Sequence, residues 1–318
     1  MPPAAGELAL GMKALVYRDF GGSDRFELTD LPAPHIGPDT LVVRVVAAGI
    51  NPVDYKVREG YLRGLIDVTL PAVPGWDVAG VVEQTGLDTP EFAVGDAVLA
   101  YARADSVQHG SLAELMPVPV RTATRKPEGI SFEQAAALPL TGLTALQSIE
   151  RSGLGEGSTV LIHGAAGGVG SFAVQLAGIR GARVVGTASE RNHDYLRDLG
   201  AEPIAYGEGL VDAAKGLAPE GYDVILDFAG GSSLDSTGAL LKPGGRVVSI
   251  ADPRARTEFG GEYVWVRPDA AQLGELAQLV ADGALRVELA ATYPLDEAVA
   301  AFAQLEEGHT RGKIVVTV

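Results

Sequence analysis

The sequence predicts an α/β protein in which a doubly wound parallel sheet is joined to a barrel-like β domain. Short strands follow one another at turn-rich spacing through the first 125 residues, which is typical of a β barrel. Strands and helices then alternate from residue 160 to residue 250, which is typical of a parallel sheet. The length of 318 residues is typical of two domains.

Composition and charge limit the possible classes of function. The chain carries 25 Lys and Arg against 41 Asp and Glu, a net charge of −16, which argues against nucleic acid or an anionic membrane surface as a partner. The absence of Cys excludes disulfides, thiolate catalysis and Cys-ligated zinc, and it fits a cytoplasmic protein. No apolar run approaches the about 18 residues of a membrane span. Residues 1–11, rich in Pro, Ala and Gly, are expected to form a disordered tail.

The N-terminal region is predicted to be built almost entirely of strands. Apolar and β-branched runs separated by Pro, Gly and polar residues indicate strands at 13–17, 26–31, 40–48, 78–85, 92–100 (after an internal turn), 110–116 and 117–122. The Asn51-Pro52 pair indicates a turn after the third of these strands. Residues 57–65 are predicted to form a short helix.

The character of the sequence changes near Ser131, which lies three residues before Gln134 in a capping-box pattern. Two helices at 135–140 and 144–151 are expected to follow. The alternating region then contains strands at 160–163, 183–187, 203–205, 223–228 and 246–250 and helices at 168–179, 190–199, 209–217 and 232–241, with an edge strand at 264–266.

The last part of the chain does not continue this alternation. A helix at 272–282 precedes a strand, a helix and a strand at 291–293, 295–306 and 313–318. We expect this segment to return to the first domain. The predicted domains are therefore 12–130 with 272–318 as the β domain, and 131–271 as the doubly wound domain.

A glycine-rich turn between strand 159–163 and helix 168–179 is typical of a dinucleotide-binding βαβ unit. Its small residues are Ala165, Gly167 and Gly170, with Gly168 and Val169 between them. The first small residue permits the tight turn, the second lets the backbone approach a pyrophosphate, and the third lets the helix pack on the strand. The free N–H groups of the helix would face the phosphates. The alternative is a tight turn that binds nothing, which the flanking strand and helix disfavour.

Eight short motifs, in order, resemble those of a known family. They are AGINPVD (48–54), PGWDVAG (74–80), GDAV (95–98), GSLAE (110–114), LTA (143–145), GAAGGVG (164–170), LGA (199–201) and RGKIV (311–315). From residue 12 to 318 the chain resembles the medium-chain dehydrogenase/reductase superfamily, on its zinc-independent quinone oxidoreductase branch. The resemblance implies a GroES-like β-barrel catalytic domain into which a Rossmann domain is inserted.

Departures from the superfamily pattern indicate that the site has lost its metal. The resemblance to zinc alcohol dehydrogenases puts a Cys ligand at Asn51 and a His ligand at Trp76. A carboxamide and an indole cannot replace them, and Asp77, at the acidic ligand position, is left without partners. Because oxidation of an alcohol is difficult without a Lewis acid, reduction of a conjugated carbonyl is favoured.

The catalytic candidates are Asn51 and Tyr55. In reduction of an enone, charge accumulates on the carbonyl oxygen, and the Asn51 amide is the best candidate to donate to it; the alternative is an Asn that only shapes the turn before Pro52. Tyr55 is a candidate donor of a hydrogen bond or a proton, or a residue that only lines the pocket wall. Trp76 and Asp54 are expected in the substrate pocket, although Trp76 could be plain core and Asp54 could order the turn or pair with a base.

Cofactor choice depends on the end of the second strand of the βαβ unit. Ala188 falls where NAD-specific enzymes of this family place an acid, while Ser189 and Arg191 can bind a phosphate, which favours NADPH over NADH. Glu190, turned inward, would favour NADH. Further cofactor-binding candidates come from strand ends and from the resemblance: Thr141, Thr144, Phe228, Ala229, Gly230, Ser249, Ile250 and Lys313. Lys313 is expected to reach the phosphates, and the alternative is an ordinary surface charge. His163 is interpreted as a strand-end residue.

The predicted function is metal-free reduction of a quinone or an α,β-unsaturated carbonyl, with hydride supplied by NADPH. The alternatives are an enoyl-thioester reductase of lipid or polyketide synthesis and a non-catalytic NADPH-binding regulator. The expected partner is a small-molecule substrate, without nucleic acid or membrane, and a homodimer is expected by analogy.

Overall fold

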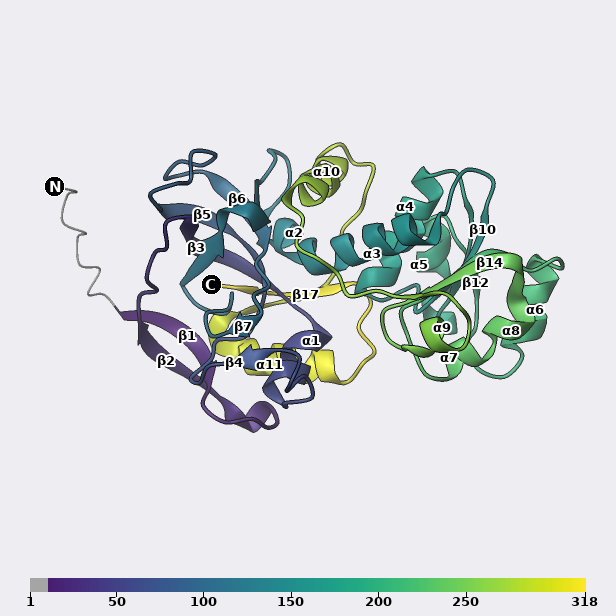
Figure 1. The fold of residues 1–318 in the computed structure, drawn as a ribbon, viewed down its shortest axis with the longest axis horizontal. Coiled ribbons are helices and arrows are strands. Elements are labelled where there is room, and N and C mark those ends of the chain that lie inside the picture. Colours follow the sequence, from purple (N-terminus) through teal and green to yellow (C-terminus); the bar gives the residue numbers. More distant parts are fainter. Residues whose placement is uncertain (1–10) are drawn as a thin grey trace.

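The computed structural model describes residues 11–318, which form two lobes joined side by side (Figure 1). The predicted tail 1–11 lies outside the described residues except for Gly11, which belongs to the first strand. The first lobe contains the early strands and the C-terminal end of the chain, and the second contains the alternating strands and helices. No helix within the described range has the length and apolarity needed to cross a membrane.

The first lobe is built around a seven-stranded, mainly antiparallel sheet with the strand order β16-β17-β3-β5-β6-β9, in which β8 also pairs with β3. A hairpin of β1 and β2 and a small pair of β4 and β7 complete the lobe. The strands are β1 (Gly11–Tyr17), β2 (Phe26–Pro32), β3 (Thr40–Ile50), β4 (Asp67–Val68), β5 (Asp77–Thr85), β6 (Ala97–Tyr101), β7 (Ser106–Val107), β8 (Leu115–Pro119), β9 (Ala123–Arg125), β16 (Leu289–Pro294) and β17 (Lys313–Thr317).

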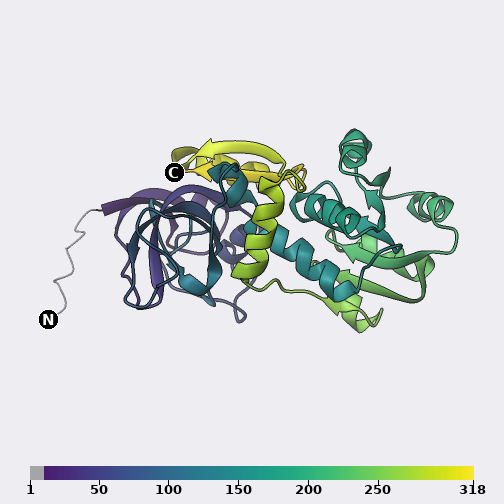
Figure 2. The same ribbon diagram turned by 90° about the horizontal axis from the view of Figure 1, so that it is seen from above.

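The C-terminal segment returns to the first lobe, as the sequence predicts. Strand β17 lies between β16 and β3, and its residue Ile314 pairs with Ile50 in antiparallel register. Helix α11 (Ala298–Glu306) covers this part of the lobe, and Figure 2 shows the C-terminal elements, in yellow, beside the N-terminal strands. The pairing puts Lys313 next to the end of β3, where Asn51 begins the following helix.

The second lobe is a six-stranded parallel sheet with the strand order β12-β11-β10-β13-β14-β15. The chain builds one side outward from β10 and then the other side from β13, so the switch point of the topology lies between these two strands. The strands are β10 (Thr159–His163), β11 (Arg183–Thr187), β12 (Glu202–Ile204), β13 (Tyr222–Asp227), β14 (Leu241–Ser249) and β15 (Glu262–Tyr263). The central strands are apolar along their length because both faces are covered.

Helices flank this sheet and connect the two lobes. Helix α4 (Gly168–Ile179) has the bounds that the sequence predicts. The connecting helices are α2 (Phe132–Ala137), α3 (Pro139–Ser152) and α10 (Ala270–Ala281), and those of the second lobe include α5 (His193–Asp198), α6 (Leu210–Leu217), α7 (Ser232–Asp235), α8 (Thr237–Leu240) and α9 (Arg254–Thr257). The fold class is therefore confirmed: a Rossmann-type sheet is inserted in a chain that begins and ends in the β lobe. The exact domain limits stay a prediction.

Several local predictions are wrong. The helix expected at 57–65 is α1 (Pro52–Arg58), because Pro52 suits the first helical position and glycines at 60 and 64, with φ of 82° and 86°, end the helical path. The strands expected at 110–116 and 117–122 are replaced by the single strand β8, which begins only at Leu115 and ends at Pro119. The edge strand expected at 264–266 is β15, and the helix expected at 232–241 divides into α7 and α8.

Candidate active site

A cleft of about 1090 Å³ lies between the two lobes and is lined by both. Its volume is at the upper end of ordinary ligand pockets, which run to about 1,000 Å³. Most of the predicted cofactor and catalytic residues line it: Asn51, Tyr55, Thr141, Gly167, Gly168, Val169, Gly170, Ser189, Arg191, Phe228, Ala229, Gly230, Ile250 and Lys313. Five predicted residues do not line it: Asp54, Trp76, Thr144, Ala165 and Ser249.

The glycine turn forms one wall of the cleft. Gly167 is the N-cap of α4, so the first N–H groups of the helix have no partner within it. A Cβ on Gly170 would come within 2.6 Å of the Ala165 Cα atom, which explains the need for glycine where helix packs on turn. Ala165 is thus a buried packing residue beneath the turn. The Gly312 N–H donates to the Ala166 carbonyl at 3.1 Å, which joins this wall to the C-terminal strand.

The carboxyl ends of β13 and β14 are ordered by a residue that the sequence reasoning missed, Asp227. Its Oδ1 atom accepts hydrogen bonds from the Gly230 N–H at 2.9 Å and the Ser233 hydroxyl at 2.6 Å, and its Oδ2 atom accepts from the Ser249 hydroxyl at 2.7 Å. Ser249 therefore acts behind the cleft, by holding Asp227, and not on its wall. The available signal was a carboxylate directly after the apolar run 224–226, at the carboxyl end of the strand.

His163, at the end of β10, lines the cleft as well. The side chain is 1% exposed, its Nδ1 atom lies 3.4 Å from the Thr187 hydroxyl oxygen, and its Nε2 atom is buried without a partner among the described residues. Burial lowers the pKa of His163, against a smaller opposing effect of Asp227. The imidazole is thus a neutral polar group at the switch point of the sheet.

The end of β11 leads to the predicted phosphate-binding pair, Ser189 and Arg191. Both side chains line the cleft, and Arg191 makes a long contact of 3.5 Å to the His309 carbonyl. Glu190 is exposed and does not line the cleft. Asn192, another cleft residue, donates its side-chain N–H to the Ser189 hydroxyl at 3.2 Å. Ordered in this way, the site presents a cation and a hydroxyl to a phosphate.

Two threonines of α3 differ in position. Thr141 lines the cleft and donates its hydroxyl to the Ala137 carbonyl at 3.0 Å. Thr144 donates to the Leu140 carbonyl at 2.6 Å and lies away from the cleft lining, so only the first of the pair can contact a ligand there.

The opposite wall of the cleft ends in a buried polar floor, made of Asn51, Asp77 and Lys313. The Asn51 Nδ2 atom donates to Asp77 Oδ2 at 2.9 Å, and the Lys313 ammonium donates to the Asn51 Oδ1 atom and to the Ile50 carbonyl, the latter at 2.9 Å. The Lys313 Nζ atom lies 3.8 Å from Asp77 Oδ2. The Lys313 ammonium is thus bonded to Asn51 and Ile50 at the floor, which differs from the expected reach to phosphates.

Burial changes the pKa of each ionisable group near this floor. It raises the pKa of Asp77 to about 6, although Lys313 and the hydrogen bond from Asn51 oppose the rise. It raises the pKa of Asp54 to about 7, against the hydrogen bond from the Asn51 backbone. Burial lowers the pKa of Lys313, while Asp77 opposes this fall. Desolvation therefore dominates over pairing in this region.

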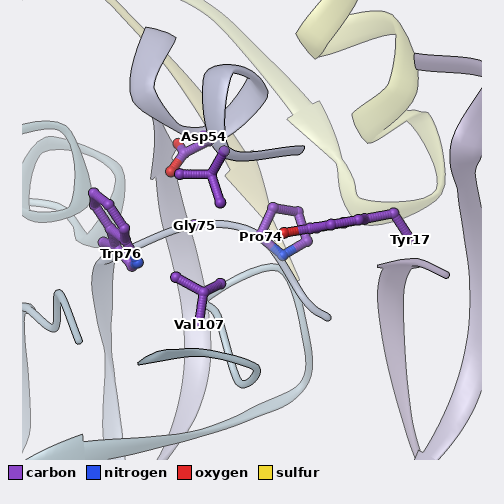
Figure 3. A pocket seen from close by; sticks show the side chains of 7 residues that line it. Tyr17, Asp54, Pro74, Gly75, Trp76 and Val107 are labelled. Carbon is purple, nitrogen blue, oxygen red and sulfur yellow. The ribbon is translucent and has the colours of Figure 1, made fainter. Parts of the chain in front are cut away.

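Asp54 and Trp76, expected in the substrate pocket, lie instead around a separate small cavity of about 10 Å³ (Figure 3). Asp54 is turned toward its own helix start, where it accepts the Asn51 N–H at 2.8 Å, and it does not pair with Lys56. The Trp76 indole meets the Tyr101 ring edge-on at 6.3 Å between centroids. Asp54 therefore orders the turn and Trp76 belongs to the core.

Tyr55 lies on α1, four residues after Asn51 of the floor. Its side chain is half-buried and lines the cleft. Burial raises the pKa of its phenol, and the carboxylates of Glu306 and Glu59 add to the rise. The phenol therefore keeps its proton at neutral pH and can donate a hydrogen bond.

The floor does not fit a zinc ion. In the described part of the chain no group of three or more His, Cys, Asp or Glu side chains could hold a metal. Asn51 and Asp77 are bonded to each other, and the Lys313 cation lies beside them. A second cation at this point would be repelled, and an ammonium cannot serve as a ligand.

Comparisons with known proteins match nearly the whole chain. Residues 37–128 match the alcohol dehydrogenase GroES-like domain, and residues 199–316 match the zinc-binding dehydrogenase family. The chain is 36% identical to an Arabidopsis thaliana chloroplastic NADPH-dependent alkenal/one oxidoreductase, over 96% of this chain and 79% of that protein. It is 30% identical to a chloroplast envelope quinone oxidoreductase homolog of the same plant, over 98% and 99%. A quinone oxidoreductase structure from Coxiella burnetii superposes with a TM-score of 0.88 at 34% identity, over 97% of this chain and all of that one.

Proposed function

Because the chain belongs to the medium-chain dehydrogenase/reductase superfamily, on its quinone oxidoreductase branch, we propose that it reduces a quinone or an α,β-unsaturated carbonyl with NADPH. That it is an oxidoreductase of this superfamily rests on the relatives named above. The proposed substrate class rests on the chemistry of the cleft.

One observation carries the proposal: a single cleft runs from the glycine turn and Arg191 to Asn51 and Tyr55. A dinucleotide with its pyrophosphate at the N-terminus of α4 and its adenine end near Arg191 would direct its other end toward the β lobe. A hydride donor and a polarising amide would then share one water-poor space, as carbonyl reduction requires.

The residues of the cleft would divide the work between binding and polarisation. NADPH, when bound, supplies the hydride. The Gly167–Gly170 backbone and Thr141 would hold the cofactor, and the Asn51 amide would donate a hydrogen bond to the substrate oxygen as negative charge develops on it. The Tyr55 phenol would be a second hydrogen-bond donor to the substrate oxygen. Solvent or this phenol would supply the proton that the enolate takes up after hydride transfer.

Preference for NADPH over NADH is supported by Ser189 and Arg191 on the cleft wall and by the exposed position of Glu190, which does not line the cleft. One relative is named as NADPH-dependent, which agrees with this preference.

Independence of metal is supported by the composition of the floor, where a lysine lies beside the acidic position. We expect prolonged dialysis against a strong chelator, measured by turnover and by metal content, to leave activity unchanged. Restoration of lost activity by zinc would refute this part of the proposal.

The deciding experiment is oxidation of NADPH and NADH, followed at 340 nm, with 1,4-benzoquinone, an enone, an enal and a crotonyl thioester as acceptors. We expect turnover of the quinone or the enone and enal with NADPH. Preferential turnover of the thioester would support the enoyl-thioester reductase, and binding of NADPH without any turnover would support the regulator.

Assembly and location remain predictions. A homodimer is expected by analogy, through the edge of the sheet at β14 and β15, and sedimentation would test it. The expected location is the cytoplasm, while several relatives carry chloroplast names and others, such as the human NAD(P)H oxidoreductase RTN4IP1, are named mitochondrial.

A further inference from the structure

We propose that Lys313 is a positioning residue: together with Asp77 it fixes and polarises the Asn51 amide so that one N–H of Asn51 faces the cleft. This role rests on the proposed carbonyl reduction, in which the Asn51 amide would donate a hydrogen bond to the substrate oxygen. We call Lys313, Asn51 and Asp77 the amide clamp.

The three residues of the amide clamp come from strands that lie side by side. Lys313 opens β17, Asn51 follows β3 and Asp77 opens β5, and the pairs Ile314–Ile50 and Gly49–Asp77 set their register. All three side chains are at least 95% buried. Such positions are set by the central strands of the lobe, so the clamp is a rigid feature.

The charges of the clamp determine which way the amide points. The ammonium of Lys313 donates to the Asn51 Oδ1 atom, and the carboxylate of Asp77 accepts from the Nδ2 atom at 2.9 Å. A flipped amide would put N–H groups against the ammonium and its oxygen against the carboxylate. Since buried charge–dipole contacts of the wrong sign are strongly unfavourable, one orientation of the amide is selected.

This orientation leaves a donor for a ligand. An amide nitrogen carries two N–H groups, and Asp77 is the acceptor for one of them. Among the described residues none accepts a hydrogen bond from the second N–H; Asn51 is fully buried in the cleft wall, so we assign this N–H to a ligand bound in the cleft. A cation at the oxygen withdraws electron density from the nitrogen, which makes the remaining N–H a stronger donor toward a developing oxyanion.

Lys313 also touches the opposite wall of the cleft. A Cβ on Gly168 would lie 3.0 Å from the Lys313 Cδ atom, so the lysine stem runs directly beneath the glycine turn. The preceding residue, Gly312, is bonded to the Ala166 carbonyl. The lysine therefore sets the spacing between the cofactor wall and the amide that would meet the substrate.

Two other roles for Lys313 make different predictions. It could only neutralise the buried Asp77, in which case its loss would reduce stability and leave the chemistry of Asn51 intact. It could also donate directly to the substrate, in which case its loss would reduce turnover even without Asn51. A double-mutant cycle separates these roles from the proposed one.

We therefore compare wild type, Lys313→Met, Asn51→Ala and the double variant, with kcat and KM measured separately and NADPH binding followed by fluorescence. We expect Lys313→Met to lower kcat about 30-fold, with NADPH affinity changed less than about threefold. In the Asn51→Ala background, the same change should lower kcat less than about threefold. A full additional loss in that background, or no loss in wild type, would overturn the proposal.

Two variants serve as controls. Lys126→Met removes a partly buried ammonium that donates to the Ile130 and Pro127 carbonyls away from the cleft, and kcat should not change. If Lys313→Met does not fold, Lys313→Met/Asp77→Asn removes both buried charges together and should show the same loss of kcat. Full activity of that folded double variant would overturn the proposal.

A readout without turnover separates this proposal from the proposed function. In a ¹H–¹⁵N spectrum of the intact protein, assigned through the Asn51→Ala variant, the Asn51 side-chain signals should shift in Lys313→Met, and their hydrogen exchange should accelerate at least about tenfold. Unchanged signals would overturn the clamp. A wild type that reduces no carbonyl would instead refute the proposed function, whatever the spectrum shows.

Discussion

The two walls of the cleft hold their ligand-facing groups in opposite ways. The glycine wall at Gly167–Gly170 offers backbone N–H groups at the start of α4 and leaves no room for a side chain at Gly170. The amide clamp offers a side-chain amide and surrounds it with buried charges. The two walls should therefore tolerate different substitutions. The glycine wall should be sensitive to added side-chain volume, and the amide clamp to a change of charge or the loss of a hydrogen bond.

The largest expected effect comes from adding volume to the glycine wall. In Gly170→Val the new side chain would overlap the Gly164 carbonyl and the Ala165 backbone, and backbone cannot move aside as a flexible side chain would. We expect a loss of about 4 kcal/mol or more in the free energy of unfolding, measured with urea, or no folded protein.

Gly178→Ala is the matched control for this prediction. Gly178 lies in the same helix, and a Cβ there meets nothing within 4 Å. Because alanine favours the helix, stability should rise by about 0.5–1 kcal/mol. Equal destabilisation by the two changes would mean that helix propensity, and not the close approach to the turn, governs this wall.

Removing the amide from the clamp should have the next largest effect, and on turnover. Asn51→Ala deletes the donor to the substrate oxygen, so we expect kcat to fall about 10²- to 10³-fold. The variant Asn192→Ala removes another cleft amide, bonded only to Ser189, and should change kcat less than about threefold. Similar losses in both variants would place the polarising group elsewhere.

The buried carboxylate beneath the clamp should appear in the pH dependence of stability. Burial raises the pKa of Asp54 to about 7. Between about pH 4 and pH 7 the unfolded chain loses this proton while the folded chain keeps it, so stability falls as pH rises through this range. Asp54→Asn cannot ionise. Its stability relative to wild type should therefore improve by roughly 2 kcal/mol between pH 5 and pH 6.5, inside this range.

Thermal unfolding at a series of pH values measures this difference. Asp96→Asn, at an exposed turn of the same lobe, is the comparison that should show no such improvement. If the difference in stability between Asp54→Asn and wild type does not change with pH, then Asp54 is ionised in the folded protein. Its carboxylate would then be better solvated than its burial indicates.

The smallest expected effect concerns Arg191, which lines the cleft after the end of β11 and would contact the ligand through its side chain. Arg191→Ala should raise KM for NADPH about tenfold and change KM for NADH less than about twofold, because only the former carries a 2′-phosphate. Arg197→Ala, which removes an exposed pair with Asp194, is the control. Equal effects on the two cofactors would mean that Arg191 does not contact the phosphate.

The glycine wall could be predicted from the sequence more fully than the wall that holds the amide clamp, because its residues are neighbours in the chain. The βαβ unit was visible because its strand, turn and helix are contiguous, and the bounds of α4 were correct. The start of α1 was misplaced because Asn51-Pro52 suits both a turn and a helix start. Asp54 and Trp76 were expected in the pocket, but the direction of their side chains depends on packing partners such as Tyr101, from a different strand.

The sequence by itself determined the order of elements, the glycine turn and the lack of thiolate chemistry, because these follow from local spacing and composition. Only the tertiary structure brought Lys313 to Asn51, across 262 positions of the chain, and bonded its ammonium to that side chain. That contact depends on the register of β17 against β3. Register is set by the packing of whole strands, and short motifs do not record it.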